Sequence, residues 1–242
     1  MLMRFLQRSR ELVRKPYRFV RGLPRKILGT RMIFTWIYWT NQWGSSESVS
    51  GSGSTERETR VVRKVLPELV RRYEIRSMLD VPCGDCNWIR RIDFGGINYI
   101  GADIVEGLIR RNQRVHGSAS RRFFNLDVVT DLLPAADLVL CRDCLIHLPN
   151  ADVLRALQNI GRTRARFLLT TTYSTRPSNP DILAGEWRPL NLQAPPFDLP
   201  RPIELISEEW NWAGGYHADK CLGLWRIEDL SELVARQQTV SR

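Results

Sequence analysis

The sequence predicts an α/β fold with a doubly wound, mostly parallel sheet, and two observations support this fold class. Short apolar segments alternate with segments of helical period along the middle of the chain, which is the pattern of strands connected by covering helices. Acidic residues also end three successive apolar segments: Asp80, Asp103 and Asp127 follow each other at intervals of 23 and 24 residues. Each interval suits one strand and one helix, so the three carboxylates are expected at the same edge of the sheet.

Six apolar segments have the length and composition of buried strands: 77–81, 97–103, 122–126, 136–141, 166–172 and 222–227. Helices are expected between them at 88–92, 105–115 and 151–161. An earlier amphipathic helix covers residues 61–73, with a kink or restart at Pro67, and a short helix begins at Glu228. The periodicity thus places most of the chain in one sheet-based domain.

Residues 77–88 are expected to carry a ligand site. They comprise a buried strand followed by a tight turn at Pro82 and Gly84 and then a helix. Doubly wound folds bind nucleotides at such a turn, and an acid at the end of the second strand, here Asp103, can accept both hydroxyls of a ribose. The three-glycine dinucleotide motif is absent, so the sequence favours a nucleoside ligand without phosphates.

The charge of the chain is concentrated near its start. Residues 1–43 carry ten Arg and Lys against Glu11 alone, so the remainder of a chain with formal charge +10 is nearly neutral. A nucleic-acid groove across the domain is therefore not expected. An odd number of cysteines, five, in a chain without a recognisable signal peptide predicts reduced thiols and a cytoplasmic location.

Three segments stand apart from the alternating pattern. Residues 1–43 combine basic residues with an aromatic cluster, which suits either an anionic membrane surface or an arm packed on the domain. Residues 44–55 are rich in Gly, Ser and Thr and form either a flexible linker or a lid. Residues 176–202 hold seven of the thirteen prolines, and so long a segment without regular structure is expected to contact the substrate.

An ordered set of motifs resembles the class I S-adenosylmethionine-dependent methyltransferases over residues 55–230. These are residues 79–86 (Leu-Asp-Val-Pro-Cys-Gly-Asp-Cys), 99–104 (Tyr-Ile-Gly-Ala-Asp-Ile), 125–127 with 133–134, and 137–141. The resemblance implies a Rossmann-like seven-stranded sheet, a methyltransferase domain over residues 44–242 with a basic N-terminal extension, and S-adenosylmethionine as cofactor. A narrower likeness, to bacterial methyltransferases of polysaccharide and glycan synthesis, rests on residues 47–54, 83–88, 142–148 and 185–192.

The resemblance assigns roles to individual residues. The cofactor is expected to contact Asp80, Pro82, Cys83, Gly84, Trp88, Asp103, Ile104, Asp127, Val128, Cys141 and Arg142. A sugar acceptor is expected to contact Asp85, Glu186, Trp187, Arg188 and Asn191, since an indole can stack on the apolar face of a pyranose. His147, just past the fourth strand, is the predicted general base, and Asp143 would orient it or contact the acceptor hydroxyl.

These inferences predict O-methylation of a sugar hydroxyl in a glycan, polysaccharide or glycolipid precursor, by an enzyme located in the cytoplasm or on the inner face of the membrane. The alternatives are a methyltransferase acting on a small molecule or RNA, and an inactive membrane-bound scaffold. The scaffold alternative rests on Pro82 and Cys86, which stand where the family has glycines. No metal site is demanded, although Mg²⁺ near Asp143 is compatible with the residues. The oligomeric state is not predicted.

Overall fold

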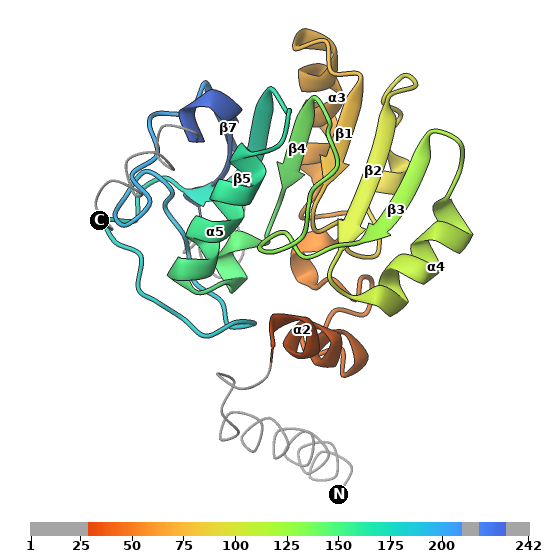
Figure 1. Ribbon diagram of the computed structural model, residues 1–242, viewed down its shortest axis with the longest axis horizontal. Coiled ribbons are helices and arrows are strands. Elements are labelled where there is room, and N and C mark those ends of the chain that lie inside the picture. Colours follow the sequence, from red (N-terminus) through yellow and green to blue (C-terminus); the bar gives the residue numbers. More distant parts are fainter. Residues whose placement is uncertain (1–28, 210–217, 231–242) are drawn as a thin grey trace, which may run out of the picture.

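The computed structural model describes residues 29–209 and 218–230 and has an α/β architecture (Figure 1). Its single sheet has seven strands in the order β3-β2-β1-β4-β5-β7-β6. Strand β7 is antiparallel to both of its neighbours, and the other pairs are parallel. The predicted fold class, a mostly parallel seven-stranded sheet, is confirmed. Most of the basic N-terminal extension, residues 1–28, lies outside the described residues.

The strands are β1 Ser77–Asp80, β2 Asn98–Asp103, β3 Arg121–Asn125, β4 Leu138–Cys141, β5 Phe167–Tyr173, β6 Glu204–Ser207 and β7 Lys220–Arg226. The helices are α2 Thr30–Trp39, α3 Arg60–Arg72, α4 Glu106–His116 and α5 Asn150–Gly161, with short 3₁₀ turns at Ser52–Ser54, Ile89–Arg91 and Leu145–His147. The helix predicted at 88–92 is thus only a 3₁₀ turn, and α3 runs through Pro67 without restarting. Strand β6 escaped prediction because it is short and its residues alternate between half-buried and exposed.

Helices cover both faces of the sheet, as a doubly wound fold requires. On one face, α5 packs Leu157 and its neighbours against Leu79 of β1. On the other face, Leu66 of α3 and Ile109 of α4 pack in a second apolar cluster with Met78 of β1. Successive residues of β1 therefore contribute to opposite cores, because strand side chains alternate between the two faces.

Helix α2 is placed differently, below the carboxyl ends of the parallel strands rather than on a face of the sheet (Figure 1). Arg31 holds it there by donating from one guanidinium nitrogen to the carbonyl of Ile104 at 2.9 Å and to Asn125 Oδ1 at 2.6 Å. From the opposite side of the helix axis, Ile33 and Ile37 contact Gly185, where an added Cβ would lie 2.9 and 2.7 Å from their side chains. The aromatic segment before residue 44 thus packs on the domain.

The starts of β1 and β4 are joined by one carboxylate. Asp137 Oδ2 accepts from the backbone N–H groups of Arg76 and Ser77 at 2.7 and 2.9 Å, and from the Ser77 hydroxyl at 3.1 Å. The two strands whose carboxyl ends carry the site are therefore fixed in register at their other ends.

Asp137→Ala is expected to lower the free energy of unfolding by about 1.5–3 kcal/mol, because these donors lose a charged acceptor. Urea denaturation measures the loss. Asp93→Ala is the matched control, since Asp93 is an exposed acid that accepts a local bond from Gly95. An equal loss in both variants would contradict the assigned role of Asp137.

Candidate functional site

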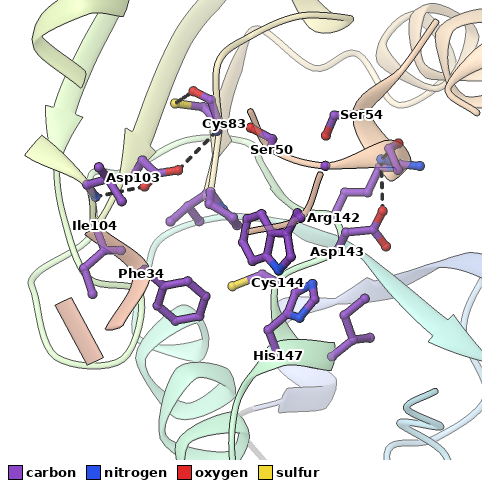
Figure 2. Close-up of a pocket in the computed structure, with 18 of the residues that line it drawn as sticks. Phe34, Ser50, Ser54, Cys83, Asp103, Ile104, Arg142, Asp143, Cys144 and His147 are labelled. Carbon is purple, nitrogen blue, oxygen red and sulfur yellow. Dashed lines mark hydrogen bonds and ion pairs between the residues drawn. The ribbon is translucent and has the colours of Figure 1, made fainter. Parts of the chain in front are cut away.

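A cavity of about 390 Å³ lies between the carboxyl ends of the strands and helix α2. Its lining includes most of the residues predicted for cofactor binding and catalysis: Asp80, Pro82, Cys83, Gly84, Trp88, Asp103, Ile104, Asp127, Val128, Arg142, Asp143 and His147. Figure 2 shows Asp103 and Ile104 at one end of this cavity and Arg142 and Asp143 at the other. Residues separated by more than 40 positions in the chain thus face one space.

The turn after β1 brings bare backbone to the cavity. Gly84 has φ +54°, and a Cβ at this position would lie 2.2 Å from Ser50 Oγ, so a larger residue would displace the segment above it. Its N–H donates to Asp103 Oδ2 at 3.2 Å, and its carbonyl accepts from Asn112 at 2.7 Å. Cys86 also has positive φ, +56°, a conformation that costs a non-glycine residue on the order of 1 kcal/mol or more. Cys86 thus takes up a conformation that a glycine would adopt without strain.

Two carboxylates are buried at the ends of β1 and β2. Asp80 accepts from the Tyr99 hydroxyl at 2.6 Å, and burial raises its pKa to about 7 despite that bond. Asp103 accepts from Gly84 and, at 2.9 Å, from the Val105 N–H, and burial raises its pKa to about 6. Burial also raises the pKa of Asp127, the third acid of the series. All three acids thus lie in the cavity wall, where burial disfavours their ionised forms.

A buried network of four charges forms the other end of the cavity. The Arg142 guanidinium lies 2.6 Å from Glu208 and 3.1 Å from Asp143, and Lys220 Nζ lies 2.8 Å from Asp143 and 3.4 Å from Glu208. Burial would raise the pKa of Asp143, but the charges of Arg142 and Lys220 outweigh it and hold the pKa well below its ordinary range. Asp143 is therefore an ionised acceptor and is unsuited to act as the base.

His147 is oriented by two contacts. Its Nδ1 lies 2.8 Å from the carbonyl oxygen of Glu186, which assigns the proton to Nδ1 and leaves Nε2 as an acceptor. The Trp43 ring packs on the imidazole, with 5.1 Å between ring centroids. Burial lowers the pKa of His147 below its ordinary 6.5, although Glu186 and Asp143 oppose the shift. The imidazole is thus neutral at pH 7, with a defined acceptor nitrogen.

The Gly- and Ser-rich segment lies over the cavity, to which residues 49–54 contribute lining. Asp85 fixes it by accepting from the Ser48 hydroxyl at 2.9 Å and from the Val49 N–H at 3.0 Å. Arg142 donates to the Gly53 carbonyl at 2.9 Å. Residues 44–55 are called the lid below, after the position of this segment over the cavity.

Five predicted site residues do not line the cavity, each for a local reason. Cys141 is fully buried in the core. Asp85 holds the lid, and Glu186 accepts from the Leu183 N–H and presents its carbonyl to His147. Arg188 is buried and donates to Asn150 and the Ile146 carbonyl, while Asn191 bonds the backbone of Arg176 and Gln193. Of the predicted acceptor contacts, Trp187 alone lines the cavity.

Sequence reasoning missed several lining residues. Tyr173 ends β5, so the carboxyl-edge argument that selected Asp80 and Asp103 could also have selected it. Lys220 begins the antiparallel β7, which reverses the rule that site residues follow strands, and nothing in the local sequence indicates its role. Phe34, Tyr38 and Trp43 also line the cavity, although their aromatic cluster indicated a membrane as readily as a site.

Metal binding gains no support from the described part of the chain. Residues 29–209 and 218–230 contain no group of three or more His, Cys, Asp or Glu arranged to hold a metal ion. All five cysteines are free thiols.

Comparisons with solved structures identify the fold of this chain. No family model and no curated protein matches this chain. The N-methyltransferase NodS from Bradyrhizobium japonicum, solved with S-adenosyl-L-homocysteine, aligns at TM-score 0.50 and 16% identity over 71% of this chain and 85% of that chain. PigF, also solved with S-adenosyl-L-homocysteine, aligns at TM-score 0.52 and 15% identity over 70% of this chain and 56% of that chain.

An O-methyltransferase family protein from Burkholderia thailandensis aligns at TM-score 0.43 and 18% identity over 55% of this chain and 47% of that chain, so this chain spans about half its length. The likeness to NodS, together with the strand order, shows that the chain has the class I methyltransferase fold.

The raised pKa of Asp103 predicts a pH-dependent stability. Because the folded-state pKa, about 6, exceeds the ordinary 3.8, Asp103 favours folding when protonated, and this contribution is lost as the pH rises through about 6. At about 1.4 kcal/mol per pKa unit, the loss is about 3 kcal/mol. Relative to Asp103→Asn, the unliganded wild type should therefore become less stable by about this amount between about pH 4 and pH 8.

Urea denaturation of both forms across this range measures the change. A constant offset from the altered hydrogen bonding does not affect it, because only the dependence of the difference on pH is compared. A difference that stays constant with pH would contradict the raised pKa.

Proposed function

We propose that this protein transfers a methyl group from S-adenosylmethionine to the oxygen of a sugar hydroxyl. One observation carries the proposal: a single cavity of a methyltransferase fold holds a buried acid, Asp103, at one end and a neutral histidine, His147, with an acceptor nitrogen at the other. The acid suits a nucleoside, and the histidine suits an alcohol that must lose its proton.

The residues at the first end fit the cofactor. Asp103 lies at the end of β2, and its ionised carboxylate can accept both ribose hydroxyls in addition to its two backbone donors. The bare backbone of Gly84 permits close approach of the ligand to the turn. Asp127 and Val128 line the wall beyond β3, next to Ile104, where an adenine ring would lie.

When bound, S-adenosylmethionine supplies an electrophilic methyl group on a sulfonium centre. The chain must then hold the acceptor oxygen in line and accept its proton as the new bond forms. His147 Nε2 would take that proton, because Nδ1 is committed to the Glu186 carbonyl. Asp143 would accept a hydrogen bond from the acceptor and hold it near the imidazole, since its pKa keeps it ionised. The aromatic side chains of Phe34 and Trp43 would exclude water.

A sugar is favoured as the acceptor by the side chains at this second end. Trp187 lines the cavity and is 42% exposed, so its indole can stack on a pyranose, and it meets the Tyr173 ring edge-on at 6.2 Å. Lys220 and Asp143, which line the same cavity, offer a donor and an acceptor. Mixed aromatic and charged contacts of this kind suit a polyhydroxylated ring. The glycan class also rests on the sequence resemblance.

Asp103→Ala is expected to weaken S-adenosylmethionine binding about tenfold or more, because a charged hydrogen-bond acceptor is worth about 1.5–3 kcal/mol. Calorimetric titration of the cofactor and of S-adenosylhomocysteine measures this directly. Asp93→Ala, an exposed acid remote from the cavity, is the control and should bind as the wild type does. Absence of binding in the wild type would overturn the proposal and favour an inactive scaffold.

His147→Ala is expected to lower kcat by about 10²–10⁴-fold while leaving cofactor affinity within about threefold, because it removes the base and not a cofactor contact. The assay follows labelled methyl transfer to a panel of alkyl glycosides, and the label should resist mild alkali as a methyl ether does. His116→Ala, at the end of α4 and outside the cavity, should retain full activity.

The wild-type rate should decline on acidification with a midpoint below 6.5, since burial lowers the pKa of His147 and only the neutral imidazole can accept the proton. Cofactor binding without transfer to any glycoside would overturn the sugar acceptor and leave the cofactor assignment intact.

A further inference from the structure

Helix α2 has two apolar sides, one that packs on the domain and one that faces away from it. Its inner side buries Ile33 and Ile37 against the domain. Its outer side presents Met32, Trp36 and Trp39, which are 58%, 47% and 76% exposed. With 3.6 residues per turn, these three side chains fall within an arc of about 60°. An amphipathic helix of a globular domain ordinarily carries polar residues on this side, so α2 has an apolar face that nothing in the described residues covers.

The chain around this face carries a charge pattern. Residues 32–43 contain no charged side chain, whereas residues 1–31 contain ten Arg and Lys and a single acid, Glu11. Tryptophan is favoured at the headgroup level of a bilayer, and clustered cations are attracted to anionic lipid. A basic stretch leading directly into exposed tryptophans therefore matches an anionic membrane in both polarity and charge.

We propose that the outer face of α2, defined by Met32, Trp36 and Trp39, docks on an anionic lipid bilayer. The three side chains enter the interfacial region, and the basic residues that precede the helix contact acidic headgroups. The attachment is peripheral: α2 has 10 residues, and within the described ranges no helix is long and apolar enough to cross a membrane. Such a helix lies in the plane of the interface.

The docking surface lies next to the cavity. Phe34 and Tyr38, on the inner side of α2, line the cavity. Gly185, in the loop that carries Trp187, contacts Ile33 and Ile37 of the same helix. A bilayer against the outer face would therefore hold the acceptor end of the site close to lipid headgroups. If the proposed function holds, the acceptor is then a lipid-linked sugar, but the docking itself does not depend on that function.

Experiment can distinguish a membrane from two other occupants of this face. A second copy of the chain would make the protein dimeric in the absence of lipid. A segment of the same chain would leave the protein monomeric and indifferent to vesicles. The charge of residues 1–31 favours the membrane over a second copy, because a contact between two copies through this face would bring like charges together.

The test is flotation of the full chain with vesicles of phosphatidylcholine alone and of phosphatidylcholine mixed with phosphatidylglycerol. The wild type is expected to float with the anionic vesicles only. The variant Met32→Ser/Trp36→Ser/Trp39→Ser should bind them about tenfold more weakly or worse, because it keeps every basic residue but loses the inserted apolar groups. Trp36→Phe/Trp39→Phe should retain most of the binding.

Val115→Ser/Phe124→Ser/Leu132→Ser is the matched control. It removes three apolar side chains that are 55%, 39% and 93% exposed on other parts of the domain, and it should float as the wild type does. Thermal unfolding establishes that each variant is folded. Brominated lipid provides a second measurement, since it should quench wild-type tryptophan fluorescence more than that of Trp36→Phe/Trp39→Phe.

Equal flotation of the wild type and the Met32/Trp36/Trp39 variant would overturn the proposal, as would a wild type that stays unbound. A wild-type dimer that this variant converts to monomer, without vesicle binding by either, would assign the face to a second copy. None of these outcomes depends on methyl transfer, so failure of the docking and failure of the proposed function are distinguishable.

Discussion

The arrangement of the site depends on one buried guanidinium. The Arg142 side chain is 4% exposed, and it contacts the lid at the Gly53 carbonyl, the segment after β6 at Glu208, and its own neighbour Asp143. A buried cation is tolerated only when such partners surround it, since its desolvation is otherwise prohibitive. The Arg142 charge thus contributes to the position of the lid, to the join with β6 and, together with Lys220, to the ionised state of Asp143.

The other end of the cavity shows the opposite balance. Within residues 29–209 and 218–230 no cation hydrogen-bonds Asp80 or Asp103, and burial raises both pKa values toward neutrality. Carboxylates in such surroundings destabilise the folded protein when ionised, and an amide would fit there at less electrostatic cost. Perturbed acids in a cavity are a common sign of a binding site, because a ligand can supply the donors that the protein withholds. The electrostatic cost of ionising Asp80 and Asp103 in the folded protein therefore favours a ligand that brings several hydroxyl donors to this end of the cavity.

The carboxyl edge of the parallel sheet was predictable from sequence, whereas the contribution of Lys220 and the buried position of Arg188 were not. Asp80, Asp103 and His147 follow apolar segments, so the rule that parallel strands end at one edge is enough to group them. Lys220 starts an antiparallel strand 77 residues after Asp143, and its contact follows from strand order alone. Arg188 has the composition of a sugar ligand but is buried among carbonyls, and no local pattern distinguishes these two roles.

Helix α2 links the two ends of the site to the surface. Arg31 attaches it beside Ile104, at the end assigned to the cofactor, while Trp43, just beyond the helix, stacks on His147 at the end assigned to catalysis. A displacement of α2 would therefore alter both the enclosure of a ligand and the orientation of the imidazole. The outer face of the same helix is apolar and exposed. A surface that binds this face would therefore act on a helix that forms part of the cavity wall. If the outer face docks as proposed, attachment and site geometry are coupled through one ten-residue element.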